Sequence, residues 1–282
     1  MPKNKNISVS REISMDRGSP SLMRRINIRQ LLDAMRTLGP CTRVDLTNHS
    51  GLSAPTVSKL MNELLRRKLV EPLPDQKKPS TGRPSTIYQL AREKVQFLGL
   101  VIDIEQSRVV SAGLDGDIEP ERKLVFKTPR TYAGLISTAS RYLKRIAALK
   151  EGAAVLGVGI SIPGLIDQSE GRQVFSPNLH FMDGRHPARD IEKATGFKTQ
   201  VVQEEQGLCL AEQLFGQARD LEDFAMIDIS AGVGMGVVSA GRFVSGSSGF
   251  AGELGHITLK PGGLLCGCGN RGCLETVASD VA

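Results

Sequence analysis

The pattern of the chain changes near residue 92, and no other feature constrains the fold as much. Residues 1–92 carry apolar side chains at helical spacing and hold 17 lysines and arginines against 7 acidic residues, whereas the rest of the 282-residue chain holds 19 against 23. After the change, short apolar runs and glycine turns are typical of strands. We therefore predict two domains, of which only the first meets a polyanion; a merely solvated basic face is the alternative.

The predicted organisation is a flexible basic tail over residues 1–24, a first domain over 25–91 and a second over 92–282. No apolar run reaches the roughly 20 residues of a membrane span. Residues 1–17 lack the apolar core of a signal peptide. We expect a cytoplasmic protein that does not contact a membrane.

The first domain has the pattern of a helix-turn-helix. Residues 28–38 predict a first helix, which ends at a Gly-Pro pair. Thr42, followed by Asp45, is a plausible cap for a short second helix that ends at Gly51, and Ser53 is a plausible cap for a third. The predicted buried stripe of the third helix comprises Val57, Leu60, Met61, Leu64 and Leu65.

Two short strands, over residues 69–71 and 87–90, flank a polar stretch with basic residues. A hairpin directly after a helix-turn-helix predicts a winged helix that binds double-stranded DNA. The third helix would enter the major groove, while the wing would meet phosphates or the minor groove. A three-helix protein-interaction module is the alternative. The predicted DNA contacts are Ser53, Ala54, Pro55, Thr56 and Lys59 on the helix and Lys77, Lys78 and Arg83 on the wing.

The second domain begins with strands. Alternation predicts strands over residues 97–104, 108–114 and 124–126, a helix over 132–149 and a buried strand over 155–161. This order indicates an α/β domain, but periodicity alone does not name its topology.

Three of the five cysteines fall within eight residues, near a histidine. His256, Cys266, Cys268 and Cys273 supply one imidazole and three thiolates, which suffice for a closed tetrahedral metal site. Soft sulfur ligands favour structural zinc over magnesium or calcium. Free thiols and a redox pair are the alternatives. The odd number of cysteines and the absence of a secretion signal argue against a disulfide framework.

Four motifs carry a specific resemblance: GISIPGLID at 159–167, SPNL at 176–179, GELGH at 252–256 and CGCGNRGCLE at 266–275. Together they resemble the ROK family, named for repressors, open reading frames and sugar kinases. The predicted winged helix, with STGRPSTIYQL at residues 80–90, is similar to that of the repressor branch. The resemblance implies an actin-like, ribonuclease-H-like fold for residues 92–282 and zinc at the cysteine cluster.

The resemblance also implies a sugar site. Carboxylates and amides suit it chemically, because sugar hydroxyls need hydrogen-bond acceptors. Polar surface residues in loops are the alternative. The implied sugar contacts are Asn178, Gln203, Glu204, Glu253, His256 and Glu275.

Three departures separate this chain from the kinase members. Their first phosphate loop reads Asp-x-Gly-Gly-Thr, where residues 103–107 read DIEQS, and Glu105 places a negative charge there. Their second loop reads Gly-Thr-Gly-x-Gly, where residues 230–234 read SAGVG. Their catalytic Asp corresponds to Glu204, whose extra methylene moves the carboxylate by about 1 Å and would slow phosphoryl transfer. We therefore assign no catalytic residue.

Family members continue well past the last motif, whereas this chain ends at Ala282. We expect a fragment or truncated product that lacks the C-terminal part of the domain, or an incomplete and less stable fold.

The predicted function is a sugar-responsive, DNA-binding transcriptional regulator, and specifically a repressor of carbohydrate-utilisation genes. Two DNA half-sites favour a homodimer or a larger homo-oligomer. The effector is a sugar or a sugar phosphate, acting as inducer or corepressor. The alternatives are an ATP-dependent ROK-type kinase of a hexose or an acetylamino sugar, and a product that binds DNA without sensing a sugar.

Overall fold

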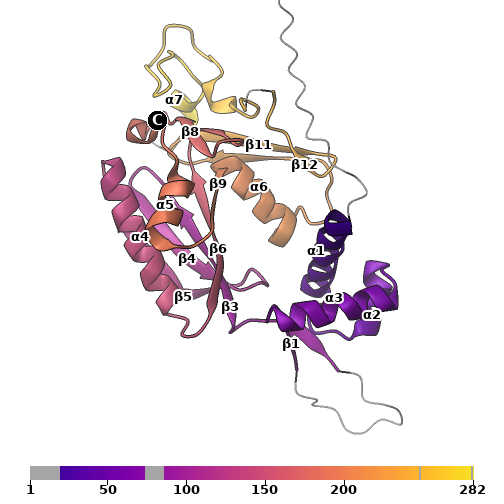
Figure 1. The fold of residues 1–282 in the computed structure, drawn as a ribbon. Helices are drawn as coiled ribbons and strands as arrows, with labels where there is room; N and C mark the ends of the chain where they lie inside the picture. Colours follow the sequence, from indigo (N-terminus) through magenta and orange to yellow (C-terminus); the bar gives the residue numbers. More distant parts are fainter. Residues whose placement is uncertain (1–19, 74–85, 248, 281) are drawn as a thin grey trace, which may run out of the picture. The chain divides into compact units, whose positions relative to one another are not determined.

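The computed structural model describes residues 20–73, 86–247, 249–280 and 282. Two compact units, Met1–Leu90 and Ala91–Ala282, divide the chain one residue from the boundary expected from the sequence. Each unit is described separately below (Figure 1). None of the helices in the described part of the chain is long and apolar enough to cross a bilayer.

The described part of the first unit contains three helices followed by a two-stranded antiparallel sheet. The helix caps expected from the sequence are confirmed. Thr42 and Asp45 form a reciprocal capping box, Gly51 ends the second helix with φ 68°, and the Ser53 hydroxyl accepts the Thr56 N–H. The elements are α1 (Pro20–Leu38), α2 (Arg43–Ser50), α3 (Ala54–Arg66), β1 (Val70–Pro72) and β2 (Tyr88–Leu90).

Two details of the first unit differ from expectation. The flexible tail was predicted over residues 1–24, but α1 already begins at Pro20. Arg24 therefore lies in the helix, and its guanidinium pairs with Glu63. On α3, Leu65 is only half-buried, and Glu63 is buried instead because Arg24 and Arg67 both neutralise it. The expected wing contacts Lys77, Lys78 and Arg83 lie outside the described residues.

A five-stranded mixed sheet organises the second unit, in the order β5-β4-β3-β6-β9. β3, β4 and β5 are antiparallel neighbours, whereas β3, β6 and β9 run parallel. The strands are β3 (Val95–Val101), β4 (Gln106–Ala112), β5 (Ile118–Lys127), β6 (Ala154–Ile162) and β9 (Thr199–Gln203).

Helices α4 (Tyr132–Ala148) and α5 (Pro187–Thr195) lie together against the sheet (Figure 1). The core between them and the strands is apolar and includes Leu100, Leu143 and Ile160, which are almost fully buried. The first three predicted strands, the helix and the following strand are confirmed. Their bounds differ from the prediction by at most three residues, except that β5 starts six residues earlier than expected.

The remaining elements carry the motifs of the sequence. Helix α6 (Glu204–Phe215) follows β9 without a loop and packs against β10 and β11 of a second antiparallel sheet. A short helix begins at Glu275, the last residue of the CGCGNRGCLE motif. The other elements are the hairpin β7 (Leu165–Asp167) and β8 (Arg172–Phe175), the sheet β10 (Phe224–Ile229), β11 (Val233–Ser239) and β12 (Arg242–Phe243), the 3-10 helices η1 (His180–Met182) and η2 (Leu254–His256), and α7 (Glu275–Ala278).

Candidate binding pocket and metal centre

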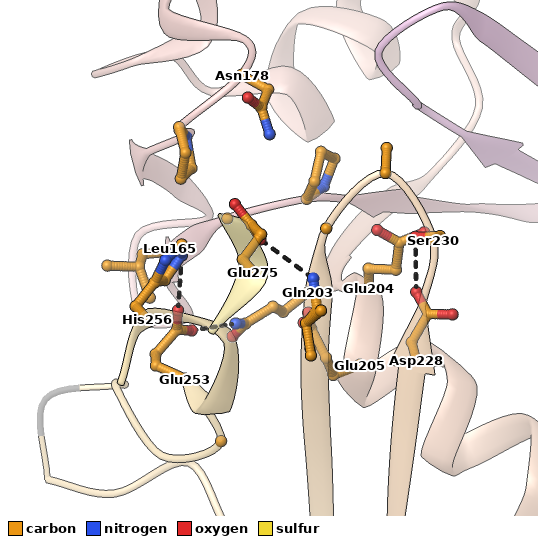
Figure 2. A pocket seen from close by; sticks show the side chains of 18 of the residues that line it. Leu165, Asn178, Gln203, Glu204, Glu205, Asp228, Ser230, Glu253, His256 and Glu275 are labelled. Carbon is orange, nitrogen blue, oxygen red and sulfur yellow. Dashed lines mark hydrogen bonds and ion pairs between the residues drawn. The ribbon is translucent and has the colours of Figure 1, made fainter. Parts of the chain in front are cut away.

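A cavity of about 530 Å³ lies in the second unit, where the carboxyl ends of β3, β6 and β9 meet the loops of the second sheet. Ligands of open α/β sheets bind at this edge, because loops there converge around the strand ends. All six residues expected to contact a sugar line the cavity: Asn178, Gln203, Glu204, Glu253, His256 and Glu275 (Figure 2).

Hydrogen bonds connect part of this group. Gln203, the last residue of β9, donates from Nε2 to Glu253 Oε1 at 3.4 Å. Glu253 Oε2 in turn lies 3.8 Å from His256 Nε2. Asn178 lies apart from the carboxylates in Figure 2 and is exposed. The cavity therefore presents amide and carboxylate groups from several loops, as hydroxyl recognition requires.

Four charged residues that the sequence analysis did not assign to the sugar site also line the cavity: Asp103, Arg108, Glu205 and Asp228. Asp228 lies near the carboxyl end of β10, where alternate side chains are half-buried. A charged residue on the inward face of a strand, just before a glycine loop, is the signal that could have identified it. Glu205 follows Glu204 in the first turn of α6.

These carboxylates change one another's protonation. Burial, together with the charges of Glu205, Asp228 and Asp103, raises the pKa of Glu204 to about 7. Burial also raises the pKa of Glu205, and its buried Oε2 has no hydrogen-bond partner among the described residues. The inner wall of the cavity is therefore a place where further negative charge is costly.

The glycine loop at residues 230–234 faces carboxylates. The Val233 N–H donates to Glu275 Oε2 at 3.1 Å. A Cβ added at Gly232 would lie 2.7 Å from the same oxygen, and one at Gly234 would meet the Glu205 carboxylate. Figure 2 shows Glu275 directed at this loop. One backbone donor that an anion could use in this loop is thus already paired within the chain.

Residues 103–107 correspond to the first phosphate loop of the kinases. β4 begins at Gln106, so Gln106 and Ser107 belong to a strand. Ser107 is fully buried, and its hydroxyl lies 2.9 Å from that of Thr128, which donates to the Asp103 carbonyl at 2.7 Å. Asp103 and Ile104 line the cavity, and the exposed Glu105 follows them, so this turn presents carboxylates where a phosphate would need donors.

The cluster His256, Cys266, Cys268 and Cys273 has the geometry of a metal centre. One ligand atom from each residue lies within 4.8 Å of the others. Cys268 Sγ and Cys273 Sγ are 3.7 Å apart, and Cys266 Sγ and His256 Nδ1 are 3.6 Å apart. Tetrahedral coordination with metal–sulfur bonds of about 2.3 Å gives sulfur–sulfur separations of about 3.8 Å, so the four residues fit such an ion.

Backbone geometry brings the cluster together and joins it to the cavity. Gly272 has φ 75°, and a Cβ there would overlap the Lys260 carbonyl, so only glycine fits. Cys266 Sγ lies 3.6 Å from Glu275 Oε1. Burial raises the pKa of the Cys266 and Cys273 thiols. A metal ion that displaced their protons would hold Cys266 in place. It would thereby fix Glu275, which lies between the cluster and the glycine loop.

The expected DNA contacts on α3 lie at its N-terminal end. Ser53, Ala54, Pro55 and Lys59 are exposed, while Thr56 is half-buried and its hydroxyl lies 2.9 Å from that of Ser53. Within the described part of the first unit, nothing covers the exposed side chains, so they are accessible to a binding partner.

Comparison with known proteins defines the family. The sequence profile of the ROK family matches residues 100–282. The chain belongs to the ROK family. Its relatives include the xylose repressor of Bacillus subtilis (strain 168), 28% identical over 95% of this chain and 69% of that protein. They also include the transcriptional dual regulator NagC of Escherichia coli (strain K12), 26% identical over 94% of this chain and 65% of that protein.

Solved structures agree with this assignment. A ROK family transcriptional regulator, a homologue of the E. coli MLC protein, matches with a TM-score of 0.75 and 30% identity, over 92% of this chain and 66% of that chain. A ROK glucokinase from Streptomyces griseus, complexed with glucose and AMPPNP, matches with a TM-score of 0.59 and 28% identity, over 65% and 57%. The chain spans about two thirds of the length of the regulators that it matches. The expected ROK domain, with the fold of ROK sugar kinases, is confirmed.

Proposed function

We propose that this chain is a sugar-responsive transcriptional regulator, and a repressor of carbohydrate-utilisation genes, which acts on DNA in the cytoplasm. The proposal rests on the presence of two different domains in one chain. A basic, capped helical unit precedes a ROK domain whose cavity is lined by hydroxyl acceptors, and the similarity to sugar-gene repressors extends over both.

The first unit acts as a winged helix. The turn at Gly51 separates α2 from α3, and the antiparallel β1–β2 pair follows, which is the element order of that motif. In this proposal, Ser53, Ala54, Pro55, Thr56 and Lys59 face base edges in the major groove, and Lys77, Lys78 and Arg83 meet phosphates or the minor groove. Two copies of the chain read two half-sites as a homodimer or larger homo-oligomer.

The cavity binds the effector. Asn178, Gln203, Glu204, Glu253, His256 and Glu275 hold its hydroxyls through amide and carboxylate oxygens and through ring nitrogens. An effector changes operator affinity only if it binds the DNA-bound and free forms differently, so the cavity must differ between these forms. The names of the relatives make xylose and N-acetylglucosamine the first sugars to test.

Zinc is the metal that we assign to His256, Cys266, Cys268 and Cys273, since three thiolates and one imidazole suit it best. Its role is structural: it holds the loop that supplies His256 and Glu275 to the cavity. We assign it no part in a reaction.

We propose that the chain is not a sugar kinase. Glu105 and Gln106 occupy the glycine positions of the first loop, and carboxylates face Gly232 and Gly234 in the second, so this region offers a nucleotide polyphosphate few donors. The ROK glucokinase resemblance and the raised pKa of Glu204 are what favour the kinase alternative. Turnover of Mg-ATP with xylose, glucose or N-acetylglucosamine would support it.

The test is genome-wide footprinting of the purified, zinc-loaded protein, repeated with a panel of sugars. The proposal predicts protection upstream of carbohydrate genes and its loss or gain with one sugar. Specific protection that no sugar changes would indicate a regulator that does not sense sugars. Affinity equal to that for a random duplex at matched salt would contradict the proposal.

A further inference from the structure

The cavity carries more negative charge than hydroxyl recognition requires. Among the described residues that line it, Arg108 is the only lysine or arginine. Neutral amides and hydroxyls can also accept hydrogen bonds from sugars, so hydroxyl recognition does not require this much charge, and the charge bears on which sugars are accepted. The carboxylates are Asp103, Glu204, Glu205, Asp228, Glu253 and Glu275.

Arg108 does not offset this charge for a ligand. Its Nη2 lies 3.8 Å from Asp103 Oδ2, so its charge is already shared with a carboxylate of the cavity. It also faces Glu204, whose pKa it lowers against the larger raising effects of burial and of three neighbouring carboxylates. An anionic ligand at Arg108 would have to compete with both groups.

One backbone donor of the glycine loop is also committed. The glycine loop at residues 230–234 offers the geometry in which proteins often bind phosphate, yet its Val233 N–H is paired with the Glu275 carboxylate. The Glu205 carboxylate covers Gly234 from the other side. A phosphate would meet carboxylate oxygens here where it needs hydrogen-bond donors.

Carboxylates already repel one another inside the cavity. The pKa of Glu204 rises to about 7 because burial and the charges of Glu205, Asp228 and Asp103 oppose its ionisation. A phosphate ester would add a charge of about −1.5 to −2 to this partly buried group. A neutral sugar adds none, and a protonated amine would relieve the repulsion.

We propose that the effector of this chain is a sugar without a phosphate group, neutral or carrying a protonated amine, and that the cavity rejects sugar phosphates. The inference rests on the proposed function and names the class of ligand for its site. Sugars that bind the zinc-loaded chain bind at least about tenfold more tightly than their phosphate esters, and the ratio falls as salt screens the repulsion.

The test is isothermal titration calorimetry of the full zinc-loaded chain with matched pairs. The probes are xylose, glucose, glucosamine and N-acetylglucosamine, each with its phosphate ester, at about 50 mM and 500 mM salt. Tighter binding of a phosphate ester would overturn the inference but keep the proposed sugar sensor. If no sugar and no ester binds, the inference on phosphate and the proposed sugar-sensing role are both overturned. Operator affinity then tests separately whether the chain still binds specific DNA.

Two variants identify the cause of the discrimination. Replacing Glu204→Gln and Asp228→Asn together removes charge while keeping side-chain size, and should reduce the ratio at least threefold. Arg108→Gln should leave the preference for the unphosphorylated member in place or increase it. A ratio unchanged by the double substitution, or sugar-phosphate binding that Arg108→Gln abolishes, would overturn the electrostatic argument. Thermal midpoints of all variants show that each is folded.

Discussion

The Arg24 guanidinium lies 2.5 Å from the Glu63 carboxylate and so joins the first turns of α1 to the helix proposed to read DNA. Glu63 also pairs with Arg67 at 2.6 Å. Its side chain is 6% exposed, whereas those of Arg24 and Arg67 are 55% and 58% exposed. The carboxylate is thus the shared centre of the network, and its loss leaves two guanidiniums without their common partner.

Glu63→Ala should therefore lower the thermal midpoint of the first unit more than Arg24→Ala does. Removing Glu63 also opens a gap beside the buried side chains of α3. Thermal unfolding followed by circular dichroism measures both variants. Equal midpoints for Glu63→Ala and the parent would contradict a structural role for the pair.

Acid should weaken this network. The Arg24 side chain lowers the pKa of Glu63 below its usual 4.5, so the folded state binds its proton less readily than the unfolded chain. The resulting stability is present above about pH 4.5 and is lost as pH falls. The midpoint difference between the parent and Glu63→Gln should shrink as pH decreases from 6 to 3. A difference that is independent of pH would exclude this linkage.

Glu204 should have the opposite dependence. Its folded pKa of about 7 exceeds the ordinary glutamate value of 4.5, so the stability of the fold decreases as pH rises between these values. Glu204→Gln removes this cost and should raise the thermal midpoint of the unliganded protein at pH 8 by several degrees, with little effect at pH 4. Differential scanning calorimetry at both pH values tests the claim. Stabilisation that is equal at pH 4 and pH 8 would refute it.

The loop that holds the metal should depend on Gly272. Gly272→Ala places a methyl group on the Lys260 carbonyl, so the cysteine ligands cannot converge and zinc content should fall well below one ion per chain. Gly262→Asn is the matched control, because Gly262 also has positive φ, 73°, but open space around its Cα. Zinc is measured by mass spectrometry of the dialysed protein. Full zinc occupancy in Gly272→Ala would contradict the requirement for glycine at this position.

Lys59 tests the DNA-binding face. Lys59→Ala should weaken operator binding by about tenfold, and should reduce the dependence on salt if the ammonium contacts a phosphate. Lys144→Ala removes the same charge from an exposed site on α4 and should have little effect. Fluorescence anisotropy with a labelled duplex measures both. Equal losses in the two variants would indicate that only net charge matters.

Local chemistry made the first unit predictable. Thr42, Asp45, Gly51 and Ser53 determine where helices begin and end through contacts within a few residues, and all four have the expected roles. Glu63 was missed as a buried residue, because its burial depends on Arg24, 39 residues earlier in the chain. Helical periodicity contains no information about such a partner.

The candidate site was predictable only in part. The four motifs contain the cysteine cluster and the cavity residues Asn178, Glu253, His256 and Glu275, whereas Gln203 and Glu204 were implied by the family resemblance outside these motifs. All six line the cavity, and the cluster forms beside it. Asp228, Arg108 and Glu205 join them through sheet pairing and the direct β9–α6 junction, which spacing along the chain does not reveal. The contact of Glu275 with the glycine loop is similarly a property of the folded chain.

The most direct test of the central claim is operator affinity with and without an effector, in the parent and in Gln203→Ala. Gln203 joins β9 to Glu253 and lines the cavity, far along the chain from α3, the helix proposed to contact DNA. The account predicts that one unphosphorylated sugar changes parental operator affinity at least tenfold, and that Gln203→Ala binds the operator normally but responds only at much higher sugar concentration. Operator affinity that no sugar changes in the parent protein would contradict it.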